Sequence, residues 1–312
     1  MAVRAEWQSH EARAEWIRGE ARAELIDPIF LVEAAINGIL LGGVLALLAL
    51  GLNLIFGVLD IVWIAYVDLV MLCMYAIYFL NAVYGWPIWA AGVASLGLGA
   101  LLGVGVHLLI ISPILTSAPI NQLLATGGLL FFLQSFATFL WTTDHKTVRL
   151  SLPSYEVAGI FLPATRLIPF AISILAVIAL YLFLTRTYIG TAIRAVSQDR
   201  DAMALMGANP QRVYIVTSAV GGAMAGLAGA LLIIQYSVHP FFGAQFGPLT
   251  FMVCVLGGLG NMVGAFIASF IMSEIIAIGG VVISTEMGYV IAFVVFIVMM
   301  FVRPGGILAR RE

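Results

Sequence analysis

Long apolar runs separated by short polar stretches fill the chain from about residue 29 to residue 302. A helix needs about 20 mostly apolar residues to cross a bilayer, and most of these runs reach that length. Helices that are broken or re-entrant are tolerated at membrane depth where protein or a water-filled path surrounds them. The pattern therefore predicts an all-α polytopic membrane protein with about eight to nine transmembrane or broken/re-entrant helices. The runs lie at about 29–57, 60–84, 86–111, 120–141, 167–187, 212–236, 248–261, 262–283 and 286–302.

Composition agrees with a membrane protein, because 62% of the residues are hydrophobic and the mean hydropathy is +1.10. Soluble domains are only about half apolar. Residues 1–27 are charged before any apolar run begins, so they do not resemble a signal peptide. Because Arg-Ala-Glu recurs there every nine residues, we expect a helical, weakly packed extension. The remaining chain divides into a transmembrane domain at 28–308, with a cytoplasmic loop at about 188–211, and a tail at 309–312.

Several function classes find no support in the residues. Basic side chains are few and scattered and the net charge is −2, so nucleic-acid binding is not expected. Lys146 is the only lysine and belongs to no Gly-x-x-x-x-Gly-Lys motif, so the chain is not expected to hydrolyse ATP by a P-loop. The four histidines form no ligand-spaced cluster, and Cys73 and Cys254 lie within apolar runs. We therefore expect no catalytic residue, metal or cofactor in this chain.

Basic residues flanking the apolar runs indicate the orientation, since such residues gather in cytoplasmic loops. Arg186 to Arg212 and the carboxyl end are accordingly placed in the cytoplasm. Counting back puts Lys146, Arg149 and Arg166 outside, which the rule disfavours, and the side of the amino terminus stays open.

Small-residue stripes of the form Gly-x-x-x-Gly allow close helix packing in lipid. They begin at Gly38, Gly99, Gly222 and Gly260.

A charged island interrupts the apolar pattern. The stretch RAVSQDRDAMALMGANPQR at 194–212 holds three arginines and two aspartates. Ser197 or Asp199 is a candidate helix cap, good helix formers follow, and Gly207 suits the end of the helix, with Gly190 ending the preceding span. The residues alone permit two interpretations, an ordinary solvated loop or a short helix that binds a partner through Met203 and Met206.

The island and its flanks resemble a known family. GTAIRAVSQDRDAMALMGANPQRV is similar to the cytoplasmic coupling loop of ATP-binding-cassette importer permeases, and in particular of the branched-chain amino acid permease group, H-type (LivH-like) subunit. The resemblance extends in order over about residues 30–308. It includes GVLALLALGLNLIFGVLDIV, FFLQ, LPS, GAMAGLAGALL, VLGGLGNMVGAFIAS and RPGGIL.

This resemblance implies a multi-pass permease of the bacterial cytoplasmic (inner) membrane, surrounded by lipid. It implies three kinds of partner: a second, LivM-like permease, two ATPase subunits that use ATP and Mg, and a periplasmic or lipid-anchored substrate-binding protein. The coupling loop would bind a groove on the ATPase and transmit its closure to the spans. The loop residues assigned in this way are Gly190, Arg194, Ala195, Asp199, Ala202, Met203, Met206, Gly207 and Asn209.

The sequence also departs from the family pattern. Where the family commonly reads Asn-Phe-Ala-His-Gly-Glu, residues 63–68 read Trp-Ile-Ala-Tyr-Val-Asp, and Leu249 replaces a frequent lysine. Since these positions are expected near the substrate path, the solute is either a branched-chain amino acid or a related small molecule such as an aromatic acid, an amide or a urea-like compound.

Polar residues within the apolar runs are candidates for that path. Asp60 and Asp68 would share a face if both lay on one helix, and they could bind a substrate ammonium or lie at the interface. Thr126, two turns before Gln134, could face the same cavity. For Gln134 and Glu274 themselves, hydrogen bonds between helices are the favoured explanation. The full candidate set is Asp60, Trp63, Tyr66, Asp68, Thr126, Gln134 and Glu274.

Two rival functions remain open at this stage. An ion-coupled secondary transporter acting alone would use the intramembrane acids, but it would not need the patterned loop at 190–209. A membrane-embedded enzyme would need a clustered metal site or an activated nucleophile. On the outer side, the aromatic stretch at 239–242 is expected either to contact a binding protein or to lie at the level of the lipid headgroups.

Overall fold

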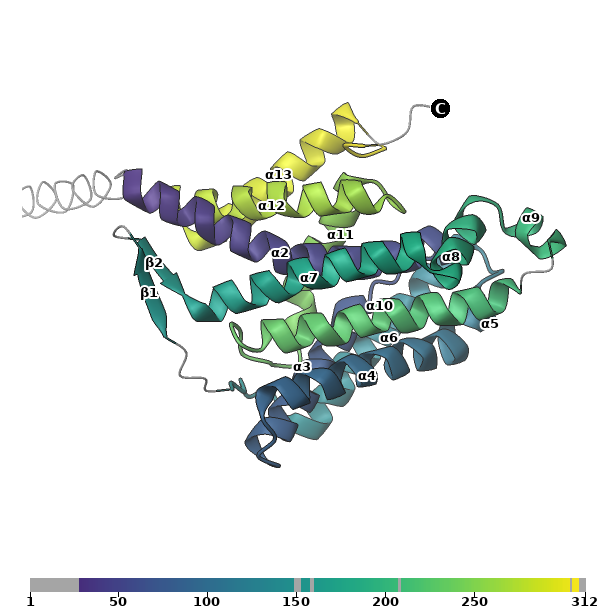
Figure 1. The fold of residues 1–312 in the computed structure, drawn as a ribbon, viewed down its shortest axis with the longest axis horizontal. Coiled ribbons are helices and arrows are strands. Elements are labelled where there is room, and N and C mark those ends of the chain that lie inside the picture. Colours follow the sequence, from purple (N-terminus) through teal and green to yellow (C-terminus); the bar gives the residue numbers. More distant parts are fainter. Residues whose placement is uncertain (1–27, 149–152, 158–159, 207–208, 304, 309–312) are drawn as a thin grey trace, which may run out of the picture.

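A computed structural model describes residues 28–148, 153–157, 160–206, 209–303 and 305–308. It is an almost entirely helical bundle (Figure 1). The predicted extension at 1–27 and the tail at 309–312 lie outside the described residues. The elements are α2 (Pro28–Leu59), α3 (Tyr66–Ala82), α4 (Ile88–Val106), the π-helical turn η1 (His107–Ile111), α5 (Ser112–Ile114), α6 (Pro119–Trp141), β1 (Ser154–Val157), β2 (Ile160–Pro163), α7 (Ala164–Arg186), α8 (Tyr188–Gln198), α9 (Arg200–Leu205), α10 (Pro210–Leu232), α11 (Phe242–Gly257), α12 (Met262–Val282) and α13 (Thr285–Val302).

The expected number of membrane segments is confirmed within the described residues. Seven helices are long and apolar enough to cross a bilayer, and two shorter apolar helices, α3 and α11, accompany them. One feature departs from a purely helical chain: β1 and β2 form a small antiparallel hairpin in the connection between α6 and α7. This hairpin lies at the end of the bundle opposite α8 and α9 (Figure 1).

Helix α2 forms the centre of the bundle. It packs against α7, α10 and α12, and its residues 44–49 are completely buried. A helix that is apolar on every side is expected where neighbouring helices, rather than lipid, cover most of its surface. In Figure 1, α2 runs from the hairpin end of the molecule to the end that carries α8.

The small-residue stripes bring α4 and α10 into backbone contact. A Cβ atom on Gly99 would overlap the carbonyl oxygen of Gly222, and one on Gly103 would overlap that of Ser218. Ser95 Oγ donates a hydrogen bond of 2.9 Å to the carbonyl of Gly226 across the same interface. These glycines therefore pack helices together, as such stripes do in membranes.

Helix α3 begins in the interior of the bundle. The hydroxyl of Tyr66, its first residue, donates to the carbonyl oxygen of Gly221 at 2.9 Å, and Gly221 lies at the middle of α10. Residues 60–65 are not α-helical and lead back to this level from the end of α2, starting at Asp60 with a φ of 62°. Asp60 and Asp68 therefore do not meet the condition under which they would share a face, because they do not lie on one helix.

The turn between α11 and α12 is the second break. Gly258 and Gly260 have φ values of 96° and 82°, a region that glycine enters without steric cost. Gly260 packs against Gly57 near the end of α2. A Cβ atom added to Gly57 would lie 2.9 Å from the Gly260 Cα. The carboxyl-terminal segment covers the same turn, since the Ile307 N–H donates to the carbonyl of Leu256.

These contacts place the two basic regions, residues 186–212 and the carboxyl end, at one end of the bundle. The ends of α2 and α13 and the helices α8 and α9 gather there, whereas the start of α2 lies at the opposite end (Figure 1). If α8 and α9 lie in the cytoplasm, as the basic residues predict, α2 starts on the outer side.

Candidate functional site

The candidate coupling element consists of α8 and α9, which follow a tight corner at the end of α7. Thr187 forms this corner: its Oγ1 donates to the carbonyl of Phe183 at 2.6 Å and accepts from the Gly190 N–H at 3.0 Å. A Cβ atom on Gly190 would overlap the Phe183 carbonyl oxygen. Gly190 was expected to end the preceding span, but that span ends at Arg186 and Gly190 lies inside α8. The glycine is needed for close approach of the two helices rather than for termination.

Helix α8 is amphipathic and its apolar side faces the bundle. Ile193 and Val196 are buried, whereas Arg194 is exposed and Ala195 is half-buried. This periodicity is typical of a helix that lies on a protein surface. Ser197 does not cap the next helix, as one of the two predictions had it, because it belongs to α8 and its Oγ donates to the carbonyl of Arg194.

Helix α9 starts at the other predicted cap. The Asp199 carboxylate accepts a hydrogen bond of 2.9 Å from the Ala202 N–H, the geometry by which a capping residue satisfies the first turn. Met203 packs against the core, but Met206 is 84% exposed and the neighbouring Leu205 is 88% exposed. The two methionines therefore differ in environment, and the apolar tip of the element is formed by Leu205 and Met206.

Polar groups connect the start of α9 to the bundle and cap the next helix, α10. Arg200 lies 4.0 Å from the Asp60 carboxylate and its guanidinium lies 6.0 Å from the ring of Tyr214. Asn209 caps α10, because its Oδ1 accepts from the N–H groups of Gln211 and Arg212. Gly207, the predicted end of the helix, lies outside the described residues.

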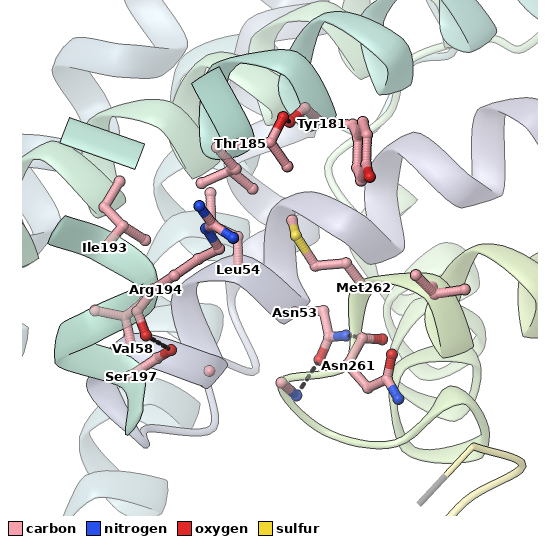
Figure 2. Close-up of a pocket in the computed structure, with 14 residues that line it drawn as sticks. Asn53, Leu54, Val58, Tyr181, Thr185, Ile193, Arg194, Ser197, Asn261 and Met262 are labelled. Atoms are coloured by element: carbon pink, nitrogen blue, oxygen red, sulfur yellow. Dashed lines mark hydrogen bonds between the residues drawn. The ribbon is translucent and has the colours of Figure 1, made fainter. Parts of the chain in front are cut away.

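A pocket of about 440 Å³ opens beside the coupling element (Figure 2). It lies between α2, α7, α8 and the turn that joins α11 to α12, and both Arg194 and Ser197 line it. Figure 2 shows the Arg194 side chain extending from α8 toward Thr185 of α7. The pocket thus borders the helix that is expected to move with a partner.

Asn53 fixes the floor of this pocket. Its Nδ2 donates to the carbonyl of Asn261 at 2.9 Å, and its Oδ1 accepts from the Gly260 N–H at 2.7 Å. Asn53 is completely buried, so these bonds join α2 to the α11–α12 turn without competition from water. Sequence reasoning did not select Asn53, although a lone amide within the apolar run GLNLIFG was a usable signal.

Five of the seven candidate path residues lie together around the start of α3. Gln134 Nε2 donates to the Asp68 carboxylate at 3.1 Å, and Thr126 Oγ1 donates to the carbonyl of Val62 at 3.1 Å. Thr126 and Gln134 thus both bond to the segment 62–68, but neither lines a described pocket, so the cavity that they were expected to share stays a prediction. Trp63 and Tyr66 meet edge to face at 6.1 Å between ring centroids. All five residues are buried, so this cluster is closed to solvent in this conformation.

The other two candidates lie apart from the cluster. Asp60 is 74% exposed beside Arg200, at the end of the bundle that carries the coupling element. Glu274 lies on α12 and packs against Gly38 of α2. A Cβ atom added to Gly38 would lie 2.8 Å from the Glu274 Oε2. The seven residues therefore do not line one continuous path in this conformation.

Comparison with known proteins agrees with this architecture. The family model described as "Branched-chain amino acid transport system / permease component" matches residues 34–300. The chain belongs to this family. The match covers all or most of each long membrane helix and the coupling element, so this member of the family is a multi-pass transport permease of the inner membrane.

Individual relatives cover nearly the whole chain. It is 28% identical over 303 residues to the high-affinity branched-chain amino acid transport system permease protein LivH of Escherichia coli (strain K12), covering 91% of this chain and 97% of that protein. It is 27% identical over 295 residues to BraD of Pseudomonas aeruginosa, a permease protein of the same description, at 90% and 96% coverage. LivM of E. coli (strain K12) is 26% identical over 258 residues, 72% of this chain and 59% of that protein. No solved structure matches the chain at a significant level.

The positions where this permease departs from the family pattern are packing positions. Trp63, Tyr66 and Leu249 are at most 2% exposed, and the Tyr66 hydroxyl is bonded to α10. The interior of the bundle accounts for the side chains of Tyr66 and Leu249, whereas the Trp63 Nε1 is buried without a hydrogen-bond partner. The effect of these positions on the solute stays a prediction.

Proposed function

We propose that this permease is one half of the translocation path of an ATP-driven importer, and that its solute is a branched-chain amino acid or a similar small molecule. The family and the names of the relatives support an amino acid solute. The observation that carries the ATP-coupled mechanism is the α8–α9 element. It projects from one end of the bundle, is held by a rigid corner at Gly190, and ends in two exposed apolar side chains.

Such a tip suits a protein groove better than water. Leu205 and Met206 would bury apolar surface on a partner, and each fully buried side chain of this kind contributes about 1.5–3 kcal/mol. We therefore assign the tip to a separate ATPase subunit, which supplies ATP and Mg. In this scheme the permease itself carries out no covalent chemistry. A second, LivM-like permease completes the path, two ATPases drive it, and a periplasmic or lipid-anchored binding protein delivers the solute.

The mechanism follows from the connections of α8. Closure of the ATPases would pull on the tip, and the corner at Thr187 and Gly190 would transmit that movement to α7. The buried face of α8 would transmit it to α2 and α10, which form the centre of the bundle. Two short helices, α3 and α11, begin within or near the core and are suited to changing position with α2. The importer would then alternate between outward and inward access.

The test is to purify the tagged full-length chain from its native membrane and to identify the proteins that accompany it by mass spectrometry. We expect two P-loop ATPases and a second permease. The double variant L205D/M206D should lose the ATPases, whereas Tyr155→Asp on the outer hairpin, which is 54% exposed, should retain them. Recovery of the chain alone, with gradient-driven uptake in vesicles, would instead support an ion-coupled transporter.

A further inference from the structure

A second pocket, of about 470 Å³, lies at the end of the bundle opposite α8 and α9. The starts of α2, α7 and α13, the end of α12 and the connection between α10 and α11 surround it. These elements gather beside the hairpin in Figure 1, on the outer side as the coupling element defines it. A solute delivered from outside would meet this region first.

The rim of this pocket carries charges of both signs. Glu33 of α2 and Arg166 at the start of α7 both line it. Among the described residues, neither forms an ion pair with the other or with any other side chain. Tyr236 lies on the same rim, and burial raises its pKa to about 12, so its phenol stays a neutral hydrogen-bond donor at neutral pH. An unpaired carboxylate and an unpaired guanidinium therefore face one cavity.

The lining of the pocket includes an oxygen atom without a donor. Asn37 lines the pocket, and its Oδ1 is buried with no hydrogen-bond partner. The Glu274 Oε1 is also buried and unpartnered, but Glu274 packs against Gly38 and does not line this pocket. Buried polar atoms without partners are costly and rare in native proteins. A ligand with several N–H donors, such as an ammonium group, would satisfy the Asn37 Oδ1.

The remaining wall is apolar. Leu41 of α2 and Ile276 and Val281 of α12 supply aliphatic side chains to the same cavity. Its volume falls within the range of small-molecule sites, which are mostly apolar with a few converging polar groups. Arginine binds carboxylates through two parallel hydrogen bonds, so Arg166 would define the position of an anionic group.

We propose that this pocket is an outer binding site for a free zwitterionic α-amino acid with an aliphatic side chain. Arg166 binds the carboxylate, Glu33 and the Asn37 Oδ1 bind the ammonium, and the apolar wall contacts the side chain. The proposal rests on the proposed import of an amino acid and names the place where this chain receives it.

One other source offers the same chemistry, because the headgroup of phosphatidylethanolamine also carries an ammonium and an anion. The two sources are separated by placing the purified full-length chain in nanodiscs of phosphatidylglycerol alone or mixed with phosphatidylethanolamine. Binding of radiolabelled L-leucine is then measured by scintillation proximity. 4-Methylpentanoate, which lacks the ammonium, and 3-methylbutylamine, which lacks the carboxylate, serve as competitors.

We expect L-leucine to bind in phosphatidylglycerol and neither competitor to displace it at equal concentration. Arg166→Gln and Glu33→Gln should each weaken binding about tenfold or more, the effect of losing one charge-assisted hydrogen bond. The matched controls are Arg186→Gln, at the other end of α7, and Glu156→Gln, on the exposed hairpin. Both should bind leucine as the wild type does. Melting temperatures of all variants establish that each is folded.

Two results would overturn the proposal. In the first, the rim variants bind leucine as tightly as the wild type. In the second, leucine fails to bind while phosphatidylethanolamine raises the melting temperature of the wild type and not of Arg166→Gln, which identifies a lipid site. Failure of the proposed function is separate, because it appears as absent ATPase partners or absent ATP-driven uptake by the wild type.

Discussion

Replacing Gly190 with alanine tests whether the corner between α7 and α8 transmits movement. The structure leaves no space for the added methyl group. A Cβ atom at this position would overlap the carbonyl oxygen of Phe183 and would lie 2.5 Å from the Cα of Leu184. Both are backbone atoms at the end of a membrane helix, so they cannot move aside as a flexible side chain can.

The size of the perturbation follows from that distance. Ordinary van der Waals contact begins at about 3.4 Å, so the corner must open by at least about 0.9 Å, the difference between 3.4 and 2.5 for the Leu184 Cα, and by more for the closer Phe183 oxygen. Opening it stretches the 3.0 Å bond from the Gly190 N–H to Thr187, which caps α8. Inserting one methyl group into a packed contact costs about 1–3 kcal/mol, which alters the position of α8 without unfolding a bundle of this size.

The assay is the ratio of solute taken up to ATP hydrolysed, in vesicles containing the complete importer. We expect Gly190→Ala to keep its partners and hydrolyse ATP but to move several-fold less solute per ATP. Gly128→Ala on α6 is the matched control, because no atom lies within 4 Å of its added Cβ. If Gly190→Ala retained the wild-type ratio, the corner would not carry the coupling, and the argument from close packing would be refuted.

Three further changes test separate parts of the structure. Asp199→Ala removes the cap of α9 and should cost about 1 kcal/mol locally, visible as faster hydrogen exchange at 200–205. Gly99→Ala should lower the free energy of unfolding by about 1–3 kcal/mol by parting α4 from α10, whereas Gly97→Ala on the same helix, with open space at its Cβ, should not. Burial, and then the nearby His145, lower the pKa of His239 below 6.5. The unfolded chain therefore binds the proton first, so stability is full above pH 6.5 and falls as the pH drops below it. His239→Gln should flatten that fall in the melting temperature.

Much of the fold could be predicted because a long, apolar run of residues identifies a membrane helix. The runs at 29–57 and 120–141 became α2 and α6 with ends moved by a few residues. The cap at Asp199 was also predictable, since capping depends on local side-chain chemistry. Close helix packing at Gly99 could be predicted from the Gly-x-x-x-Gly spacing, because small residues at this spacing allow helix backbones to approach closely in lipid.

The breaks in helices were harder to predict, because they depend on contacts between distant residues. The run at 60–84 looks continuous, yet the chain stays non-helical until Tyr66, whose hydroxyl binds a carbonyl 155 residues away. Asp60 and Asp68 were paired on the assumption of one helix, and that assumption failed at this break. The outer pocket was equally hidden, since Glu33, Arg166 and Asn37 come from separate segments and no local pattern links them.

The buried carboxylate of Asp68 provides the last test, since its surroundings suggest why an acid is tolerated there. It lies in the first turn of α3, and the first turn of α11 packs against it at Gly243. Helix starts carry partial positive charge, and Gln134 adds a donated hydrogen bond at 3.1 Å.

Asp68→Asn keeps an oxygen that accepts from Gln134, so we expect it to cost less than Asp68→Ala. The alanine variant leaves the amide of Gln134 without its partner, a loss of about 1–3 kcal/mol, in addition to the vacated volume. Melting temperatures of both variants, with Gln134→Leu in each background, measure the coupling between the two side chains. If Asn and Ala were equally destabilising and uncoupled from Gln134, the negative charge itself would be required. Asp68 would then have to be explained by a cation or by movement of α3 and α11 rather than by packing.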